Sequence, residues 1–295
     1  MKMLNRSPLV RHDLRIDGGV LQLEQTLGLR DDPWLADHCL NGEAVLPAAA
    51  ALEWMAQVVE RGRPGWQVAE VRDLRVLAGV RLDGNADRRL VVRATAGDNI
   101  SLGEQLLSVE ILNPAQKYRA CYRATLRIVE RLDQAPMLPS PNLLGAPVRL
   151  SAGHAYRDYL FHGQRFRTLE GDMLCNGEGI NATVRSSSPQ TFGIGEGAWL
   201  FDPAVLDAIP QLAIVWSRLN FGTTPLPSAI ACVRRYASAG AGPLRLIWRT
   251  RPDSLPEWLH YDAWVADADS RVVLVVEGAE GAASPALNRL ATAAA

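Results

Sequence analysis

The chain has 295 residues, of which 48% are hydrophobic and 21% are charged, and its formal net charge at pH 7 is −1. This length suits one large domain or two ordinary ones, and the composition is typical of a globular protein rather than a disordered or fibrous one. A protein that binds nucleic acid through phosphate contacts usually carries a basic face, and the interspersed charges here indicate none. We therefore expect no nucleic-acid partner.

The N-terminus, the apolar segments and the cysteines indicate the compartment. Residues 1–11 include basic side chains but not the continuous apolar stretch of a signal peptide, and no apolar run approaches the roughly 20 residues that span a bilayer. The four cysteines, Cys39, Cys121, Cys175 and Cys232, are far apart and form no CxxC pair. These features predict a cytoplasmic protein with reduced thiols and no membrane partner.

In the first half, a helix is predicted after Pro47, which suits a first helical turn. Its apolar residues at helical spacing are Ala48, Leu52, Met55 and Val59, and Gly62 can close its C-terminus. Alternation of apolar and polar residues then predicts antiparallel strands at residues 74–82, 89–95, 107–112 and 122–128. We expect one face of the helix and one face of each strand to be buried together.

The second half repeats this plan after a segment rich in Pro, Ser and Asn, which we interpret as a linker over residues 133–147. Asp202 can cap a helix that has Pro203 at its first position. The apolar residues of this helix, at the same offsets as in the first one, are Val205, Ile209, Leu212 and Trp216. Strands are predicted at residues 244–249, 261–265 and 271–277.

A long helix followed by several strands, present twice, predicts an α+β protein. Each of its two units would consist of an antiparallel sheet wrapped around one long helix. The units expected are residues 1–132 and 148–281, and residues 282–295 read as a loose tail.

Several motifs make the chain similar to a known family. Residues 33–47, PWLADHCLNGEAVLP, have the HxxxGxxxxP pattern of dehydratase domains of polyketide and fatty acid synthases, with His38, Gly42 and Pro47 at its defining positions. Residues 202–211, DPAVLDAIPQ, are similar to the family's HPxxxDxxxQ motif, and residues 161–166, FHGQRF, resemble its YGPxF element. The continuation ALEWM at residues 51–55 resembles most the dehydratases of bacterial polyunsaturated fatty acid and enediyne synthases.

This resemblance covers nearly the whole chain in the right order, and it implies a double hotdog fold. It also implies the dehydration of a β-hydroxyacyl thioester to an α,β-enoyl thioester in polyketide or fatty acid biosynthesis. The substrate would arrive on the phosphopantetheine arm of an acyl carrier protein, and other synthase domains or subunits would be further partners. No bound cofactor is expected, because the thioester itself acidifies the Cα proton. The sequence leaves a homodimer open.

Dehydration requires a base for the Cα proton and an acid for the leaving hydroxide. His38 is the expected base, because a neutral imidazole is available near pH 7. Asp207 is then the expected acid, and apolar surroundings would keep it protonated. Gln211 lies one helical turn later and can hold the carboxyl group in one rotamer. Backbone N–H groups near Gly42, which precedes the first helix, are expected to receive the thioester carbonyl.

The chain departs from the family pattern at several positions. Asp202 replaces a His, with its capping function intact, and Pro210 removes a backbone donor, so that it should bend or shorten the Asp207 helix. His162 and Gln164 replace the Tyr and Pro around Gly163. His162 either forms a hydrogen bond with the substrate or carrier arm, or simply packs.

Two arginines and the five histidines bear on ligands other than the acyl group. Arg165 and Arg167 are candidate contacts for the carrier arm or an acidic carrier protein, with solvated strand arginines as the alternative. The histidines, His12, His38, His154, His162 and His260, show no HExxH motif or close pairing, so no metal site is expected.

Two other functions fit the same residues. A related double hotdog enzyme with the same His and Asp would isomerise a double bond or close a ring on a carrier-bound chain. A non-catalytic module would only bind carriers, and the departures at His162 and Pro210 would then be signs of decay. Whether His38 and Asp207 face each other across one cavity discriminates this last alternative from an enzyme.

Overall fold

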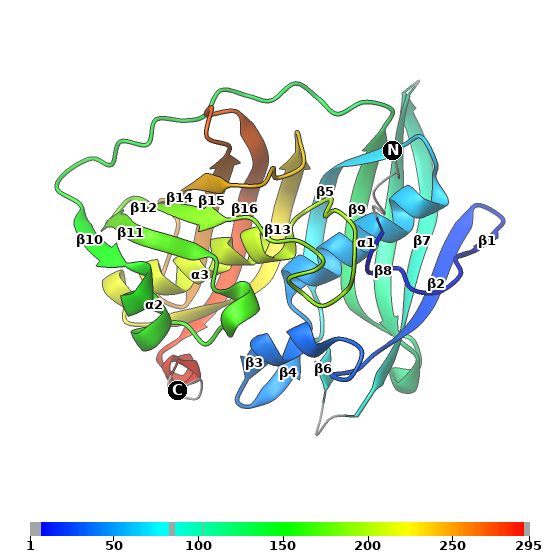
Figure 1. The fold of residues 1–295 in the computed structure, drawn as a ribbon, viewed down its shortest axis with the longest axis horizontal. Coiled ribbons are helices and arrows are strands. Elements are labelled where there is room, and N and C mark those ends of the chain that lie inside the picture. Colours follow the sequence, from blue (N-terminus) through cyan, green and yellow to red (C-terminus); the bar gives the residue numbers. More distant parts are fainter. Residues whose placement is uncertain (1–6, 83–85, 102, 292–295) are drawn as a thin grey trace.

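The computed structural model describes residues 7–82, 86–101 and 103–291. Figure 1 shows two long helices, α1 (Ala48–Gly62) and α3 (Pro203–Asn220), one in each half of the molecule, with strands curving around them. The strands of the first half are β1 (Arg15–Asp17), β2 (Val20–Leu27), β3 (Cys39–Leu40), β4 (Glu43–Val45), β5 (Gln67–Val76), β6 (Arg81–Leu82), β7 (Arg88–Ser101), β8 (Glu104–Asn113) and β9 (Arg119–Val129). Its 3-10 helices include η1 (Pro33–Asp37) and η3 (Pro114–Gln116).

The second half begins with β10 (Val148–Ser151) and the short helix α2 (Ala152–Asp158). Its further strands are β11 (Leu169–Asn176), β12 (Gly179–Arg185), β13 (Thr224–Arg235), β14 (Pro243–Thr250), β15 (Trp258–Ala266) and β16 (Val272–Ser284). Its 3-10 helices are η4 (Gln164–Phe166) and η5 (Pro285–Leu290).

The two halves repeat one strand order and share one sheet. The thirteen strands run β1-β2-β7-β8-β9-β5-β13-β16-β15-β14-β12-β11-β10, so the order β2-β7-β8-β9-β5 returns reversed as β13-β16-β15-β14-β12. In each of these five-strand sets, the strand that precedes the long helix, β2 or β12, lies farthest from the junction. The first strand after the helix, β5 or β13, lies at the junction. β5 and β13 pair antiparallel there, which makes the sheet continuous. The predicted double hotdog is confirmed.

Both long helices begin where the sequence predicted. Pro47 is the N-cap of α1, and the side chain of Asp202 accepts hydrogen bonds from the backbone of Ala204 and Val205 at the start of α3. Most residues of both helices are buried, because each helix lies between the sheet and the other half. These two helices also contact each other.

Pro210 does not shorten α3, which contradicts one of the two effects expected from sequence, a bend or a shortening. The helix continues from Pro210 to Asn220 without a break. A proline removes one backbone N–H bond, and the helix tolerates this loss because its turns are held by burial on several sides. Asp207, one turn earlier, therefore keeps a helical position.

Strand prediction was less complete than helix prediction. The predicted strand at residues 74–82 is two strands, β5 and β6, which belong to different sheets. Strands β1, β2, β3, β4, β10, β11, β12 and β13 were not predicted. Gly171 interrupts the apolar alternation in β11, as do the two prolines of β13, and pairing with neighbours outweighs local propensity there. β12 was missed although Ile180, Ala182 and Val184 alternate with polar residues.

Residues 282–291 are not a loose tail. Ala282 to Ser284 belong to β16, and residues 285–290 form η5. The side chain of Asn288 accepts a hydrogen bond from Thr224 Oγ1 at 2.8 Å and donates one to the backbone oxygen of Gly222, also at 2.8 Å. Leu290 is buried. Long-range contacts that local composition does not reveal hold this segment, whereas residues 292–295 lie outside the described part.

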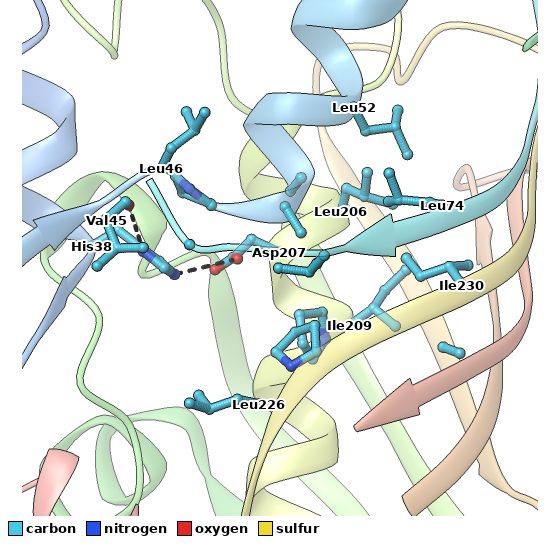
Figure 2. Close-up of a pocket in the computed structure, with 18 of the residues that line it drawn as sticks. His38, Val45, Leu46, Leu52, Leu74, Leu206, Asp207, Ile209, Leu226 and Ile230 are labelled. Carbon is cyan, nitrogen blue, oxygen red and sulfur yellow. Dashed lines mark hydrogen bonds and ion pairs between the residues drawn. The ribbon is translucent and has the colours of Figure 1, made fainter. Parts of the chain in front are cut away.

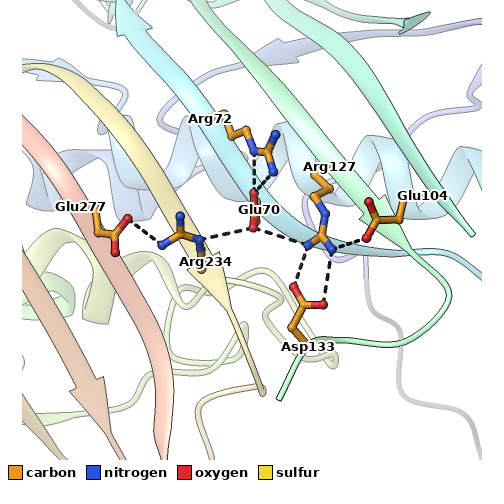
Figure 3. Close-up of polar contacts among 7 residues, drawn as sticks. All are labelled: Glu70, Arg72, Glu104, Arg127, Asp133, Arg234 and Glu277. Atoms are coloured by element: carbon orange, nitrogen blue, oxygen red, sulfur yellow. Dashed lines mark hydrogen bonds and ion pairs between the residues drawn. The ribbon is translucent and has the colours of Figure 1, made fainter. Parts of the chain in front are cut away.

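Polar side chains on the sheet tie the two halves and the start of the linker together (Figure 3). Glu70 of β5 is buried and accepts hydrogen bonds from Arg127 of β9 and from Arg234 of β13, at 3.4 and 3.3 Å. Arg127 also bonds to Asp133 at 2.7 Å. The network further includes Arg72, Glu104 and Glu277. From β9 to β10 the chain has neither helix nor strand, and we keep residues 133–147 as the proposed linker between proposed units 1–132 and 148–281.

All four cysteines are free, and Cys121, Cys175 and Cys232 are buried. In the described ranges, no helix is both long and apolar enough to cross a membrane.

Candidate active site

His38 lies at the C-terminal end of η1, directly before β3. Its backbone N–H bonds to Leu35 and its backbone oxygen accepts from Val45, which fixes the peptide on both sides. The ring Nδ1 lies 3.0 Å from the backbone oxygen of Val45. This contact favours the tautomer with the proton on Nδ1, because a carbonyl oxygen only accepts. Nε2 then carries the free lone pair.

Asp207 lies one and a half turns into α3 and is buried. Its Oδ1 atom is 3.9 Å from Nε2 of His38. Gln211 donates from Nε2 to Oδ2 of Asp207 and to the backbone oxygen of Phe166, both at 3.0 Å, while its Oε1 accepts from Tyr156 at 3.1 Å. Gln211 therefore contacts the carboxyl group as the helical spacing predicted, and its own orientation is fixed from two sides.

His162 is buried, and its Nε2 lies 3.2 Å from Oδ2 of Asp207. The ring stacks on Phe161 with centroids 4.0 Å apart. The sequence left open whether His162 bonds to the substrate or carrier arm or simply packs. In the structure it packs against Phe161, and its polar contact is with Asp207. The next residue, Gly163, lies against Asp37 of η1. A Cβ atom at position 163 would lie only 2.7 Å from Cα of Asp37, so a side chain does not fit there. The glycine allows its N–H to bond to Asp37 at 2.7 Å.

His38, His162 and Asp207 share one cavity of about 240 Å³ between the two helices, which we call the main cavity because it holds the proposed acid and base. Figure 2 shows His38 and Asp207 pointing toward each other, with the apolar part of the wall beyond them. Apolar side chains that line this cavity include Leu46, Leu52, Leu74, Ile209, Leu226 and Ile230. A cavity of this kind suits an apolar chain with a polar group at one end.

Burial lowers the pKa of His38 to about 4, although the nearby Asp207 acts in the opposite direction. The imidazole is therefore neutral at pH 7, as expected for a base.

The electrostatics of Asp207 differ from the expectation. Burial by itself raises the pKa of Asp207, but His162, His38 and the Gln211 hydrogen bond outweigh it, so the pKa lies below its ordinary value. The prediction that apolar surroundings keep the free carboxyl group protonated was wrong. The ionised carboxylate is favoured because the side chains of Gln211 and His162 both approach Oδ2 with a nitrogen.

Gly42 does not lie at the start of the helix. It occupies the turn between β3 and β4 with a φ of +80°, next to Asn41 at +54°. It lines a second cavity of about 290 Å³ together with His162, Gly163 and Arg167, rather than the cavity that His38 and Asp207 line. A tight hairpin requires positive φ at this position, which explains the glycine.

The N-terminus of α1 does reach the main cavity, through Pro47, Ala48 and Ala49. The first N–H groups of a helix have no partner within the helix. Sequence reasoning missed the two alanines as site residues, although their position directly after the HxxxGxxxxP motif was a usable signal.

The two candidate arginines of the carrier arm have internal partners. Arg165 forms an ion pair with Asp37, with 2.7 Å between Nη1 and Oδ2. Arg167 donates from Nε to the backbone oxygen of His162 at 2.8 Å, and its guanidinium lies over the ring of Tyr156. Only Arg167 lines the second cavity.

The fold also pairs two histidines that are distant in sequence. The rings of His38 and His162 have centroids 5.5 Å apart. Together with Asp207 they bring three potential metal-ligand atoms within 4.8 Å of one another. The absence of a close histidine pair along the sequence therefore did not reveal this contact, since spacing along the chain carries no information on it.

Comparison with known proteins identifies the family. Residues 7–113 match the family model described as polyketide synthase dehydratase domain, and residues 134–290 match the one described as polyketide synthase dehydratase N-terminal domain. A polyunsaturated fatty acid synthase chain of Thraustochytrium sp. is 26% identical over 226 residues, which are 73% of this chain and 8% of that protein. A mycocerosic acid synthase-like polyketide synthase of Mycobacterium tuberculosis is 28% identical over 225 residues, 72% of this chain and 10% of that protein. The chain thus spans about a tenth of the length of these relatives.

Solved structures share the fold. The dehydratase domain from the CurJ module of curacin polyketide synthase superimposes with a TM-score of 0.75 and 17% identity, covering 96% of this chain and 98% of that one. The dehydratase domain of a mycocerosic acid synthase-like polyketide synthase has a TM-score of 0.70 and 23% identity, with the same coverage of 96% and 98%. By its two family matches, the chain belongs to the polyketide synthase dehydratase family.

Proposed function

We propose that this protein removes water from a β-hydroxyacyl thioester carried by an acyl carrier protein, with His38 as base and Asp207 as acid. The observation that carries this proposal is the approach of His38 Nε2 to within 3.9 Å of Asp207 Oδ1 in one cavity. A module that only binds carriers would not need these two groups face to face.

His38 takes the Cα proton. The Nδ1 contact with Val45 leaves the lone pair of Nε2 available, and an acyl chain in the apolar part of the cavity brings its reacting carbons to the polar end. As the Cα–H bond breaks, the proton moves to Nε2 and a double bond forms between Cα and Cβ.

Asp207 gives a proton to the β-hydroxyl group. Its lowered pKa leaves the carboxyl group ionised in the substrate-free protein, so it takes up this proton when the acyl chain fills the cavity and excludes water, which favours the neutral form. Gln211 and His162 both approach Oδ2, so Oδ1 is the oxygen that is left to carry the proton, and it faces His38. When the Cβ–O bond breaks, the hydroxide takes this proton and leaves as water. The proton on His38 then returns to Asp207, which restores the starting state without a bound cofactor.

The thioester carbonyl is best placed at the N-terminus of α1. Ala48 and Ala49 line the same cavity as His38, and the free N–H groups and the dipole of the helix stabilise negative charge on the carbonyl oxygen. Stabilisation of this oxygen makes the Cα proton more acidic.

The carrier arm enters most directly through the second cavity. This cavity shares His162 and Phe161 with the main one, and at Gly42 in its wall nothing lies within 4 Å of the position of a side chain, which leaves room for a narrow chain. Arg167 is the better candidate for the phosphate of the arm, because Arg165 is paired with Asp37. The carrier and other parts of a synthase would be its partners.

Mass spectrometry of a β-hydroxyacyl carrier protein tests this function. Incubation with the protein should remove one water from the acyl group, and His38→Ala and Asp207→Asn should each lower the rate by roughly 100- to 10,000-fold. A change of the acyl group at constant mass would indicate isomerisation instead. Loss of water at an undiminished rate in both variants would rule out this pair of residues.

A further inference from the structure

The polar end of the main cavity has the geometry of a metal site as well as that of an acid–base pair. Nε2 of His38 lies 3.9 Å from Oδ1 of Asp207, and Nε2 of His162 lies 3.2 Å from Oδ2. In a tetrahedral zinc site, bonds of about 2.0–2.2 Å place neighbouring ligand atoms roughly 3.3–3.5 Å apart. One ligand atom from each of the three residues lies within 4.8 Å of the other two, so side-chain shifts of up to about 1 Å would bring all three to that spacing.

Two of the three ligands already have the outer partners that metal-binding side chains use. Nδ1 of His38 bonds to the backbone oxygen of Val45, so that Nε2 is directed toward the cluster. Gln211 holds Oδ2 of Asp207 and leaves Oδ1 available. For Nδ1 of His162, the described residues provide no hydrogen-bond partner, which indicates an affinity below that of a dedicated structural zinc site.

The ligand types and their surroundings favour zinc. Two imidazoles and one carboxylate are a common set for Zn²⁺, with a fourth position left open to water or another ligand. Here the open position faces the main cavity, which His38, His162 and Asp207 all line. The aromatic side chains Phe161 and Phe166 contact the His38 ring and limit its movement.

We propose that His38, His162 and Asp207 bind one Zn²⁺ ion and that this ion inhibits the enzyme. The inhibition rests on the function proposed above, since a metal on Nε2 of His38 occupies the lone pair that takes the Cα proton. Metal binding itself does not depend on that function. His162 is the residue that turns a two-residue pair into a three-ligand site.

Calorimetric titration of the metal-free protein with Zn²⁺ tests binding without reference to turnover. We expect one equivalent to bind, and we expect His38→Ala, His162→Phe and Asp207→Asn each to weaken this binding at least tenfold. His260→Ala is the matched control, because His260 pairs with Asp253 in a partly exposed two-residue contact. Binding of Co²⁺ should give the visible absorption bands of a tetrahedral site in the wild type and in His260→Ala only.

The result that would overturn the proposal is unchanged Zn²⁺ affinity in His162→Phe and His38→Ala, or no binding at one equivalent. Thermal unfolding of each variant identifies loss of the fold, and Asp207→Asn, which keeps the side-chain shape, remains informative if a His variant is unstable. Inhibition by Zn²⁺ that a chelator reverses is the expected outcome in the activity assay. A protein that binds Zn²⁺ through the three residues but does not dehydrate would refute only the proposed function.

Discussion

Nε2 of His38 lies 3.9 Å from Oδ1 of Asp207, although the two residues come from opposite halves of the chain. His38 is held by the backbone of Val45 and Asp207 by the side chain of Gln211. Neither half contains both groups, so the pair exists only because the two halves pack together at the β5–β13 junction, where α1 and α3 contact each other. The activity should therefore depend on residues that orient the pair as well as on the pair itself.

Gln211→Leu should lower kcat by roughly 10- to 100-fold while the protein stays folded. The substitution removes the donor to Oδ2 of Asp207, and a hydrogen bond to a charged group contributes about 1.5–3 kcal/mol. Tyr156→Phe should cause a smaller loss, because Tyr156 contacts Gln211 but not the carboxyl group, and Gln211 keeps its other partner. Steady-state kinetics with a β-hydroxyacyl thioester measures both effects, and wild-type kcat in a folded Gln211→Leu variant would speak against orientation by Gln211.

Gly163→Ala should destabilise the protein by roughly 1–3 kcal/mol, because the added methyl group would overlap with the backbone of Asp37. The adjacent His162 would shift with it, so activity should fall together with stability. Gly177→Ala, where an added Cβ meets nothing within 4 Å, provides the control. Denaturant unfolding and turnover would be measured for both, and wild-type stability of Gly163→Ala would contradict the close approach.

Ile230→Phe should shorten the apolar part of the main cavity. In the view of Figure 2, Ile230 lies on the side of the cavity away from His38. We expect kcat/KM to fall for long acyl chains and to stay near the wild-type value for a four-carbon chain. Ile230→Val, which removes one methyl group, is the control. A loss that is equal at every chain length would place the acyl chain elsewhere.

Glu53 should make the stability of the protein depend on pH. This side chain is fully buried in α1 and accepts hydrogen bonds from the backbone of Leu200 and Phe201, directly before α3. Burial raises the pKa of Glu53 from 4.5 to about 8. Because the folded state then binds this proton more tightly than the unfolded chain does, the contribution is complete below about pH 4.5 and is lost as the pH rises to about 8.

As the pH rises through this window, the free energy of unfolding of Glu53→Gln should therefore increase relative to that of the wild type. The increase can reach about 1.4 kcal/mol for each pH unit by which the pKa of Glu53 differs between the folded and unfolded chains. The free energy of unfolding at several pH values between 5 and 9 measures this difference. Glu43→Gln, the same substitution at a partly exposed glutamate, is the control. A difference between wild type and Glu53→Gln that stays constant over the window would show that Glu53 keeps its charge in the folded protein.

The sequence by itself determined the two long helices and predicted the groups that we propose to react. Helical spacing and caps at Pro47 and Asp202 defined α1 and α3, because these signals depend on residues within one or two turns. The spacing of Gln211 from Asp207 likewise fixed their contact, since both lie on one helix. The HxxxGxxxxP motif singled out His38.

Only the tertiary structure decided which distant groups meet. The contact of His162 with Asp207, the place of Gly42 in a hairpin, and the pairing of β5 with β13 all join segments without a shared local pattern. The lowered pKa of Asp207 follows from these contacts and not from its apolar neighbours in sequence. Hydrogen bonds and charges act over a few ångströms in space, so their effect on the pKa of Asp207 can be predicted only from the packed structure of both halves.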